Sequence, residues 1–302
     1  DAVSVTGSRA PMTVEQSPKI VSVITRDDIH RAAAQTINDV LKLATGVDVR
    51  QRGGFGVQTD ISLNGGTHDQ LTILLNGVNI SNPQTGHNAS DFPVSIDDIE
   101  RIEVLEGAAA RVYGSNAFSG AINIVTRKDV DQHQLTARLE SGSFGTVGTE
   151  GSYEWGKSMV GHALVSGGYT RSDGGSANSD FEKGRMYLNG QMNLLPNLSM
   201  NGQMGWSLQS YGANTFYSSL FPDQYEKTMH LMGSYGLTWR NVVKGLELSP
   251  TVYYNQFKDH YQLTRDMAGA AAGENYHDLD IYGLTLNALL EWSLGKTSLG
   301  AD

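Results

Sequence analysis

The stretch Ile99–Arg127, IERIEVLEGAAARVYGSNAFSGAINIVTR, decides how this chain folds. Two β-prone runs at its ends are separated by a middle rich in glycine, alanine and serine. Gly107, Gly114 and Gly120 are positions where the backbone can bend, or approach another strand, without a Cβ atom in the way. The pattern therefore predicts strands that pack closely within a small domain.

Short helices and strands alternate upstream of this stretch. Thr25–Asp28, Thr36–Asp39 and Ser95–Asp98 each have the hydroxyl and carboxylate spacing of a capping box, which satisfies free amides at a helix start. We expect a short helix after each, with Gly46 ending the second. Strands are predicted at Val47–Arg50, Ile61–Leu63, Leu71–Leu75 and Ile102–Leu105, with Asn76-Gly77 as a tight hairpin turn. The first part is thus an α+β domain.

From about residue 132 the sequence alternates with a period of two. In the run 185–194, Met and Leu alternate with Arg, Tyr, Asn and Gln, and similar runs at 198–208, 229–239 and 282–294 carry Trp or Tyr near their ends. One face is apolar and the other polar, which is typical of transmembrane β-strands with aromatic girdles. About eight strands are predicted, at residues 134–141, 148–156, 159–171, 184–194, 198–209, 228–240, 246–263 and 278–294, and a ninth begins at Thr297.

The connections between these strands alternate in length. Those at 156–158, 195–197, 241–245 and 295–296 are short, whereas 172–183, 209–227 and 258–278 are long and polar. Short turns suit the periplasmic rim of a membrane barrel and long loops suit its outside. Eight strands close only around a side-chain-filled interior, so we expect further strands beyond Asp302, where the terminal aromatic of such barrels is also missing.

Composition excludes several classes of protein. The net charge of −10 over 302 residues, without a basic stripe, argues against nucleic acid as a partner. The chain has no cysteine, hence no disulfide or thiolate site. It shows no nucleophile elbow, paired-histidine metal motif or phosphate loop, so we expect no enzyme activity. No run approaches the about 20 apolar residues of a membrane helix, and no signal peptide begins at Asp1.

Residues 1–128 resemble the N-terminal part of TonB-dependent receptors. The resemblance rests on Val21–Ile29, Leu41–Val49, Leu71–Ile80 and Val112–Ser115, which occur in the expected order. It implies a TonB box and linker at 1–18, an α+β plug domain at 19–130, and at 131–302 the N-terminal part of a transmembrane antiparallel β-barrel of about 22 strands. It also implies active transport across the outer membrane of a Gram-negative bacterium, with lipid around the barrel.

The segment Asp1–Ser8, DAVSVTGS, looks like a TonB box. An extended segment with free backbone donors and acceptors can add a strand to a partner. The resemblance therefore implies binding of the TonB–ExbB–ExbD complex through a set of consecutive residues, Asp1, Ala2, Val3, Ser4, Val5, Thr6 and Gly7.

Two loops of the plug region, Gln51–Thr59 and Asn79–Phe92, are predicted to contact substrate. Both offer amides and hydroxyls and carry little charge, which suits a large polar ligand; ordinary loop composition is the alternative interpretation. The predicted contacts are Gln51, Arg52, Phe55, Val57, Gln58, Asn82, Gln84, Thr85, His87 and Asn88.

Within the family, the chain is most similar to cobalamin receptors, on the runs Val47–Gly56, Asn82–Pro93, Tyr113–Gly120 and Gly295–Asp302. This implies cobalamin as the transported ligand. It also raises a calcium site at Asp173, Asp180 and Glu182, although calcium takes about six to eight oxygens and such carboxylates more often only solvate a loop. Apart from calcium, no cofactor is expected.

The chain departs from the family pattern where an Arg-Gly-Pro is common, because it has Glu106-Gly107-Ala108 instead. Arg111 is then the candidate to lock the plug to the barrel. The long loops also leave room for a surface lipoprotein that caps them.

Other ligands and classes stay open at this stage. A ferric-siderophore receptor would favour several basic residues, and the plug loops offer Arg50 and Arg52. A haem receptor would want an exposed histidine, for which His68 and His87 are available. A passive porin would lack a folded plug, and a secreted adhesin would present polar rather than apolar outward faces.

Overall fold

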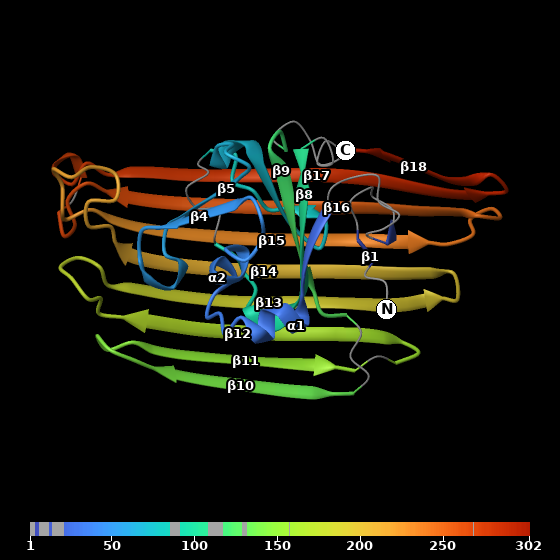
Figure 1. Ribbon diagram of the computed structural model, residues 1–302, viewed down its shortest axis with the longest axis horizontal. Coiled ribbons are helices and arrows are strands. Elements are labelled where there is room, and N and C mark those ends of the chain that lie inside the picture. Colours follow the sequence, from blue (N-terminus) through green and yellow to red (C-terminus); the bar gives the residue numbers. More distant parts are fainter. Residues whose placement is uncertain are drawn as a thin grey trace.

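The computed structural model describes residues 4–5, 12–13, 21–84, 91–107, 117–128, 132–156, 158–267 and 269–302. These residues form a small mixed domain, residues 21–128 (the N-terminal domain), and a wide antiparallel sheet, residues 134–301 (the wall sheet). The N-terminal domain lies against one face of the wall sheet (Figure 1).

The wall sheet is a meander in which each strand pairs antiparallel with the next. The alternating pattern predicted all of its strands, and the bounds differ by a few residues at most. The strands are β10 (Gln134–Ser141), β11 (Val147–Trp155), β12 (Gly161–Ser172), β13 (Phe181–Leu195), β14 (Leu198–Gly212), β15 (Tyr225–Trp239), β16 (Leu246–Gln262), β17 (Asn275–Trp292) and β18 (Gly295–Ala301).

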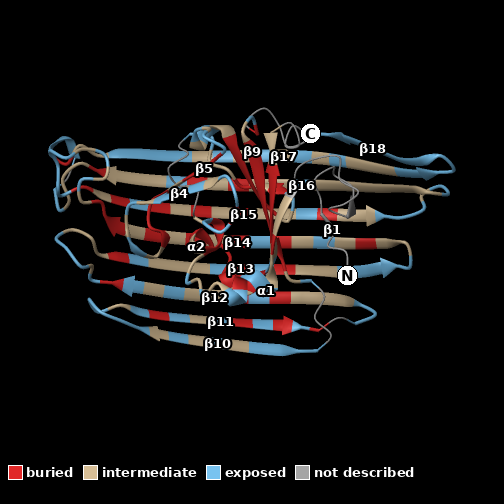
Figure 2. Cartoon of the chain, in the orientation of Figure 1, coloured by how far each residue is buried: buried red, intermediate tan, exposed pale blue. Residues whose placement is uncertain are grey.

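The two faces of the wall sheet differ as the alternation predicts. On β13, Met186 and Leu188 are exposed, whereas Tyr187 and Asn189, which alternate with them, are buried. Figure 2 shows buried and exposed residues alternating along the central strands. The apolar side chains therefore point away from the N-terminal domain, and the polar ones point toward it.

The N-terminal domain contains a five-stranded sheet and a separate hairpin, which confirms the α+β expectation. The sheet order is β3-β8-β9-β6-β7, with β6 parallel to β9 and the other pairs antiparallel. Its strands are β3 (Val21–Thr25), β8 (Ile99–Glu106), β9 (Gly120–Thr126), β6 (Leu71–Leu75) and β7 (Val78–Asn79), and the hairpin is β4 (Val47–Gln51) with β5 (Thr59–Leu63). A short ladder joins β1 (Ser4–Val5) to β2 (Met12–Thr13).

The capping boxes start helices as predicted. Thr25 caps α1 (Arg26–Arg31), Thr36 caps α2 (Ile37–Leu41) and Ser95 caps the 3-10 helix η5 (Ile96–Asp98). Other 3-10 turns are η2 (Gly54–Gly56), η3 (His68–Gln70) and η7 (Gly269–Ala271). Within the described part of the chain, no helix is both long enough and apolar enough to cross a membrane.

The expectation that Gly46 ends the second helix is wrong. Helix α2 ends at Leu41, where the Lys42 N–H donates to the Asn38 carbonyl oxygen. Gly46 instead has a φ of +79° and leads into β4, where its carbonyl oxygen accepts from the Asn64 N–H at 2.8 Å.

The Asn76-Gly77 turn between β6 and β7 brings the N-terminal domain to the wall sheet. Both residues have positive φ, 51° and 82°, as a tight hairpin requires. The Asn76 Nδ2 group lies 2.9 Å from the Tyr187 hydroxyl and 2.8 Å from Gln203 Oε1. Gln203 Nε2 in turn donates to the Leu75 carbonyl oxygen at 3.1 Å. The turn is therefore bonded to both β13 and β14.

One apolar core extends from the N-terminal domain to the wall sheet. Every residue of β6 and β9 is buried. Leu164, Tyr187 and Met232 of the wall sheet belong to the same buried cluster. Figure 2 shows the buried residues of this core where the strands of the N-terminal domain cross the wall sheet.

Gly120→Ala is expected to lower the free energy of unfolding of the N-terminal domain by about 3 kcal/mol or more. Gly120 has a φ of +156°, and a Cβ atom there would collide with the Leu105 carbonyl oxygen. Gly107 has a φ of +53°, but no atom of the described residues lies within 4 Å of a Cβ placed there, so Gly107→Ala is the matched control with a cost of about 1 kcal/mol. The two costs are measured in the intact protein by urea unfolding, with hydrogen exchange of the backbone amides of the N-terminal domain as the readout. Equal costs would contradict the close approach at Gly120.

Candidate functional site

The first predicted ligand loop, Gln51–Thr59, is a strained turn between β4 and β5. The Arg52 N–H donates to the Gln58 carbonyl oxygen at 3.1 Å and closes it. Phe55 and Gln58 have φ values of +51° and +43°, the left-handed region that side chains other than glycine rarely adopt. Each costs about 1 kcal/mol or more, so other contacts must hold the loop in this shape.

The wall sheet supplies those contacts. Lys183 Nζ donates to the Phe55 carbonyl oxygen at 2.9 Å. The Phe55 ring packs on Phe181, with ring centroids 5.5 Å apart. Gln58 Nε2 donates to the Tyr217 hydroxyl at 3.2 Å. Both strained residues are therefore tied to the wall sheet.

Two predicted ligand contacts of this loop are buried. Val57 is 2% exposed and Gln58 is 0% exposed. Val57 belongs to an apolar cluster with Phe181, Tyr211 and Ala213. In this conformation both side chains serve the contact between the N-terminal domain and the wall sheet, and Val57 also borders the cleft described below.

Arg52 and Gln51 lie at the edge of the loop. Arg52 donates from Nη1 to the Phe216 carbonyl oxygen, and its Nη2 lies 3.4 Å from Asp60 Oδ2. Gln51 accepts from Lys42 Nζ at 3.0 Å. Arg52 is thus shared between the N-terminal domain and the connection that follows β14.

A cleft of about 240 Å³ opens beside Arg52. It lies between the first loop and the connections that follow β12 and β14. Apart from Arg52 and Asp180, its lining side chains are uncharged, among them Ser176, Asn214 and Phe216. This cleft is the candidate ligand site of the described residues.

The second predicted loop, Asn79–Phe92, contributes nothing to this cleft in the described part of the chain. Asn82 Oδ1 accepts from the Gln84 N–H at 3.0 Å, which forms a local turn. Neither residue lines the cleft. The other predicted contacts on this loop lie outside the described residues: Thr85, His87 and Asn88.

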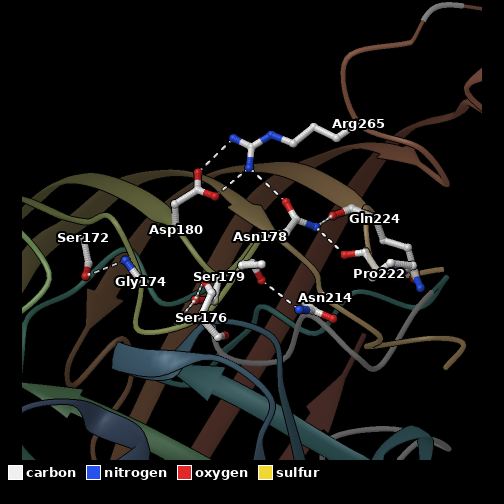
Figure 3. Close-up of polar contacts among 11 residues, drawn as sticks. Ser172, Gly174, Ser176, Asn178, Ser179, Asp180, Asn214, Pro222, Gln224 and Arg265 are labelled. Carbon is white, nitrogen blue, oxygen red and sulfur yellow. Dashed lines mark hydrogen bonds and ion pairs between the residues drawn. The ribbon is translucent and has the colours of Figure 1, made fainter.

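Arg265 joins three connections of the wall sheet on the cleft side (Figure 3). Its guanidinium forms a two-point ion pair with Asp180, with N–O distances of 2.6 and 2.8 Å. Nη1 also donates to Asn178 Oδ1 at 3.0 Å. Asn178 Nδ2 donates to the carbonyl oxygens of Pro222 and Gln224, at 2.9 and 2.6 Å. We call Arg265, Asp180 and Asn178 the loop latch.

The loop latch also sets the charge of the cleft. The hydrogen bonds from Arg265 hold the pKa of Asp180 below its usual range, so this carboxylate stays ionised and is neutralised by its partner. Arg52 meets Asp60 only at 3.4 Å. The cleft therefore presents a basic group that is less fully neutralised than its acidic one.

The predicted calcium ligands Asp173, Asp180 and Glu182 do not come together. Asp180 is engaged by Arg265, and Asp173 Oδ1 accepts from Arg171 Nη2 at 2.6 Å. Among the residues that the structure describes, no three His, Cys, Asp or Glu side chains form a metal site. Arginines pair with two of the three carboxylates here, and calcium binding by these residues stays a prediction.

The predicted TonB-binding segment is described only at Ser4 and Val5. Their backbone pairs with Met12 and Thr13. The remaining predicted residues lie outside the described part of the chain: Asp1, Ala2, Val3, Thr6 and Gly7. Binding of a partner by this segment stays a prediction.

An ion pair joins the N-terminal domain to the wall sheet at Arg127. Its guanidinium contacts the Glu154 carboxylate of β11, and both side chains are largely buried. The sequence pointed to Arg111 for such a lock, and that residue lies outside the described part. Glu106, at the departure from the family pattern, accepts from Asn64 Nδ2 at 3.1 Å within the N-terminal domain.

Asp91, at the end of the second loop, is an interface residue that sequence reasoning missed. Gln209 Nε2 donates to its Oδ1, and Thr228 Oγ1 donates to its Oδ2 at 2.6 Å. Burial raises the pKa of the Asp91 carboxyl to about 6; these donors and the charge of Lys183 oppose the shift, and Asp259 adds to it. A lone aspartate in a polar loop carries no local signal for such an environment.

Comparison with known proteins agrees with this architecture. Residues 13–121 match the family model described as the TonB-dependent Receptor Plug Domain. The ferric citrate transporter FecA superposes with a TM-score of 0.76 at 16% identity, covering 95% of this chain and 47% of that one. The copper transporter OprC gives 0.74 at 18% identity, with 94% and 45% covered.

A third solved structure, the siderophore receptor PiuA from Acinetobacter baumannii, gives a TM-score of 0.74 at 15% identity, covering 99% of this chain and 47% of that one. The chain thus spans about half the length of the solved structures that it matches. Together these findings show the fold: a TonB-dependent receptor plug domain against a sheet that matches part of a receptor barrel.

Arg265→Ala is expected to loosen three connections at once, 173–180, 213–224 and 263–274. Loss of a charge-assisted pair that leaves Asp180 without its partner should cost about 1–3 kcal/mol of local order. Hydrogen exchange resolved by peptide measures this in the three connections. Arg240→Ala is the matched control, because Arg240 pairs with Glu247 at 3.3 Å beside a short turn at the other end of the sheet. Loosening of a single connection would contradict the latch.

Asp91→Asn should remove a pH dependence of the free energy of unfolding, which arises from the Asp91 carboxyl buried between the N-terminal domain and the wall sheet. The pKa of Asp91 is about 6 in the fold and about 3.9 in an unfolded chain. The folded state therefore favours the protonated carboxyl, and its contribution to stability is lost as the pH rises through 6. Relative to Asp91→Asn, the wild-type domain should gain about 1–2 kcal/mol of unfolding free energy between pH 7.5 and pH 5. Urea unfolding at both pH values measures this gain. If the difference in unfolding free energy between the wild type and Asp91→Asn does not change with pH, the pKa of Asp91 is not raised in the fold.

Proposed function

We propose that this chain is the plug and the first barrel segment of a TonB-dependent outer-membrane receptor that imports an anionic metal chelate, of which ferric siderophores are the leading class. The observation that carries the proposal is the match of residues 13–121 to the plug domain, in a domain that lies against a sheet with an apolar outer face. A folded plug bonded to the wall is what a passive porin lacks.

The apolar outer face supports a place in the outer membrane. Met186 and Leu188 are exposed on consecutive outward positions of β13, and Leu284 is exposed on β17. The aromatic side chains of Trp239 and Trp292 are exposed near strand ends. In water such a face would drive association, whereas in lipid it is satisfied. No catalytic role is proposed.

The charge of the cleft supports an anionic ligand. Asp180 is neutralised by Arg265, and Arg52 keeps the weaker partner. Arginine is suited to the carboxylate and catecholate oxygens of chelates because its planar group forms paired hydrogen bonds. The solved relatives named above are a ferric citrate transporter, a copper transporter and a siderophore receptor.

Cobalamin, the ligand implied by the sequence resemblance, gains no support from these comparisons. We keep it as the competing ligand of the binding test, together with haem. A surface lipoprotein that covers the long connections is a prediction that no described feature tests.

In the proposed mechanism, ligand enters the cleft from the side of the long connections. The segment Asp1–Gly7 then adds a strand to TonB, and the TonB–ExbB–ExbD complex supplies the pull. The pull must break the contacts that hold the domain to the wall, among them Arg127 with Glu154 and Asn76 with Gln203. In this mechanism the chain neither makes nor breaks a covalent bond of its ligand.

Binding and uptake by the whole receptor test this function. Equilibrium binding is measured with ferric citrate, a ferric catecholate siderophore, haem and cyanocobalamin. We expect at least one ferric chelate to bind, and Arg52→Ala to weaken it about tenfold, with Arg50→Ala as the control because Arg50 pairs with Asp48 outside the cleft. Deletion of Asp1–Gly7 should leave binding intact and stop uptake.

The outcomes separate the parts of the proposal. Binding of cyanocobalamin alone would replace the ligand class and keep the receptor. Uptake at the wild-type rate without Asp1–Gly7 would refute TonB coupling. If Arg52→Ala and Arg50→Ala weaken binding equally, the ligand does not bind in the cleft beside Arg52.

A further inference from the structure

The apolar outer face of β17 is bounded by two aromatic side chains. Trp292 and Tyr282 are exposed on this face, ten positions apart along the strand. The exposed apolar side chains between them are Leu284, Leu286 and Leu290. Ten positions span about 34 Å along a strand, or about 26 Å in height at a strand tilt of about 40°. This height matches the apolar band of an outer-membrane barrel, about 25 Å tall, so Tyr282 lies at the edge of the band on the side of the long connections.

The strands continue well past that edge. Tyr254 of β16 lies beside Tyr282, with ring centroids 5.0 Å apart. The 17 residues of β16 make the strand about 56 Å long and about 43 Å high at the same tilt. About 18 Å of its height therefore stands beyond the apolar band, on the side of the long connections.

The outer face of β16 and β17 is polar in this part. Its outward positions are Gln256, Lys258, His260, Tyr276, Asp278 and Asp280. Asn255 and Phe257, which alternate with them on β16, are buried on the opposite face. We call these six outward residues, together with Tyr254 and Tyr282, the outer patch.

Contacts within the outer patch orient its polar groups. The Lys258 ammonium lies 3.2 Å from the Asp278 carboxylate, and Gln256 Nε2 donates to the same carboxylate at 3.4 Å. The Tyr254 hydroxyl donates to Asp280 Oδ1 at 2.5 Å. The side chains of Lys258 and Asp278 are still 48% and 55% exposed. The patch is thus arranged in advance and remains open to a ligand.

Two tyrosine rings of the outer patch are open to the surroundings. Tyr276 is 67% exposed and Tyr282 is 78% exposed. The Tyr276 ring stacks on the His260 ring, with centroids 4.2 Å apart and an interplanar angle of 7°, which holds it in place. A sugar ring packs its C–H groups on such an aromatic face, and its hydroxyl groups bond to carboxylates and amides beside it. The outer patch offers both kinds of contact.

The charge of the outer patch argues against a phosphate group as its ligand. Asp278 and Asp280 outnumber the single ammonium of Lys258, and Glu274 adds a carboxylate 3.3 Å from His260. Such a surface repels an anion. Among the residues described, no three His, Cys, Asp or Glu side chains form a metal site, so a cation that would bridge phosphate to these carboxylates has no preformed site. A neutral ligand rich in hydroxyl groups fits the patch best.

We propose that the outer patch binds the core saccharide of lipopolysaccharide, the glycolipid of the outer leaflet. The acyl chains then lie against the leucines between Trp292 and Tyr282, and the sugars stand beside the patch. One amphiphile therefore matches both parts of a continuous surface, which is apolar on one side of the tyrosine pair and polar on the other. The placement in a membrane rests on the proposed function, whereas binding of the saccharide is a property of the patch.

Titration of the whole receptor in detergent, followed by native mass spectrometry, tests the outer patch. One probe is lipopolysaccharide with its core sugars, and the other is lipid A, which lacks these sugars and keeps the phosphates and acyl chains. We expect the wild type to bind the form with core sugars about tenfold more tightly. The double variant Tyr276→Ala with Tyr282→Ala should lose this preference, and Asp280→Ala should reduce it several-fold.

Tyr235→Ala is the matched control. Tyr235 is also an exposed tyrosine, and it pairs with the exposed Val252 within the apolar band of the outer face. This variant should keep the preference for the core sugars. Equal binding of the two probes by the wild type, tighter binding of lipid A, or equal loss of the preference in Tyr235→Ala and in the double variant overturns the proposal.

Cell fractionation separates this proposal from the proposed function. If the receptor is absent from the outer membrane, the proposed function fails, and the titration in detergent still decides whether the outer patch binds the saccharide. If the receptor lies in the outer membrane and the wild type shows no preference between the two probes, the outer-patch proposal fails alone.

Discussion

The polar inner face of the wall sheet needs hydrogen-bond partners, and the rest of this structure depends on how the N-terminal domain supplies them. A polar side chain that is buried without a partner costs free energy. Tyr187 and Gln203 meet Asn76, and Ser166 donates to the Asp98 carboxylate at 2.6 Å. The same alternation that turns Met and Leu outward therefore obliges the sheet to bind something polar on its other side.

This kind of contact also suits a domain that must be displaced. The shared apolar core draws Leu164, Tyr187 and Met232 from the wall sheet, and a second, smaller apolar cluster joins Val57 to Phe181, Tyr211 and Ala213. Many of the other described contacts across this interface are hydrogen bonds and ion pairs, which water can replace at a modest net cost. The interface is thus specific in register without being as costly to open as an apolar core of the same extent.

At the ligand end, the wall sheet sets the shape of loops that do not set their own. Phe55 keeps a left-handed backbone because Lys183 and Phe181 hold it, and the connections around the cleft are joined by Arg265. A site held in this way is arranged before ligand arrives, which lowers the ordering cost of binding.

Local chemistry determined most of the fold from the sequence alone. The capping boxes at Thr25 and Thr36, the Asn76-Gly77 turn and the two-residue alternation of the wall strands act between residues close in the chain, so their patterns could be read directly. Gly46 was misread because a positive-φ glycine fits the entry to a strand as well as the end of a helix.

The candidate site was decided by tertiary structure. Val57 and Gln58 became buried, Asp180 found Arg265 across 85 positions and Asp91 found Thr228 across 137. No local pattern records such pairings, because they arise when strands distant in sequence place their inward side chains against the domain. The sequence by itself determined which elements form and which face of each strand is polar. Only the tertiary structure decided which polar groups meet, because burial and hydrogen-bond geometry exist only once the domain lies against the wall.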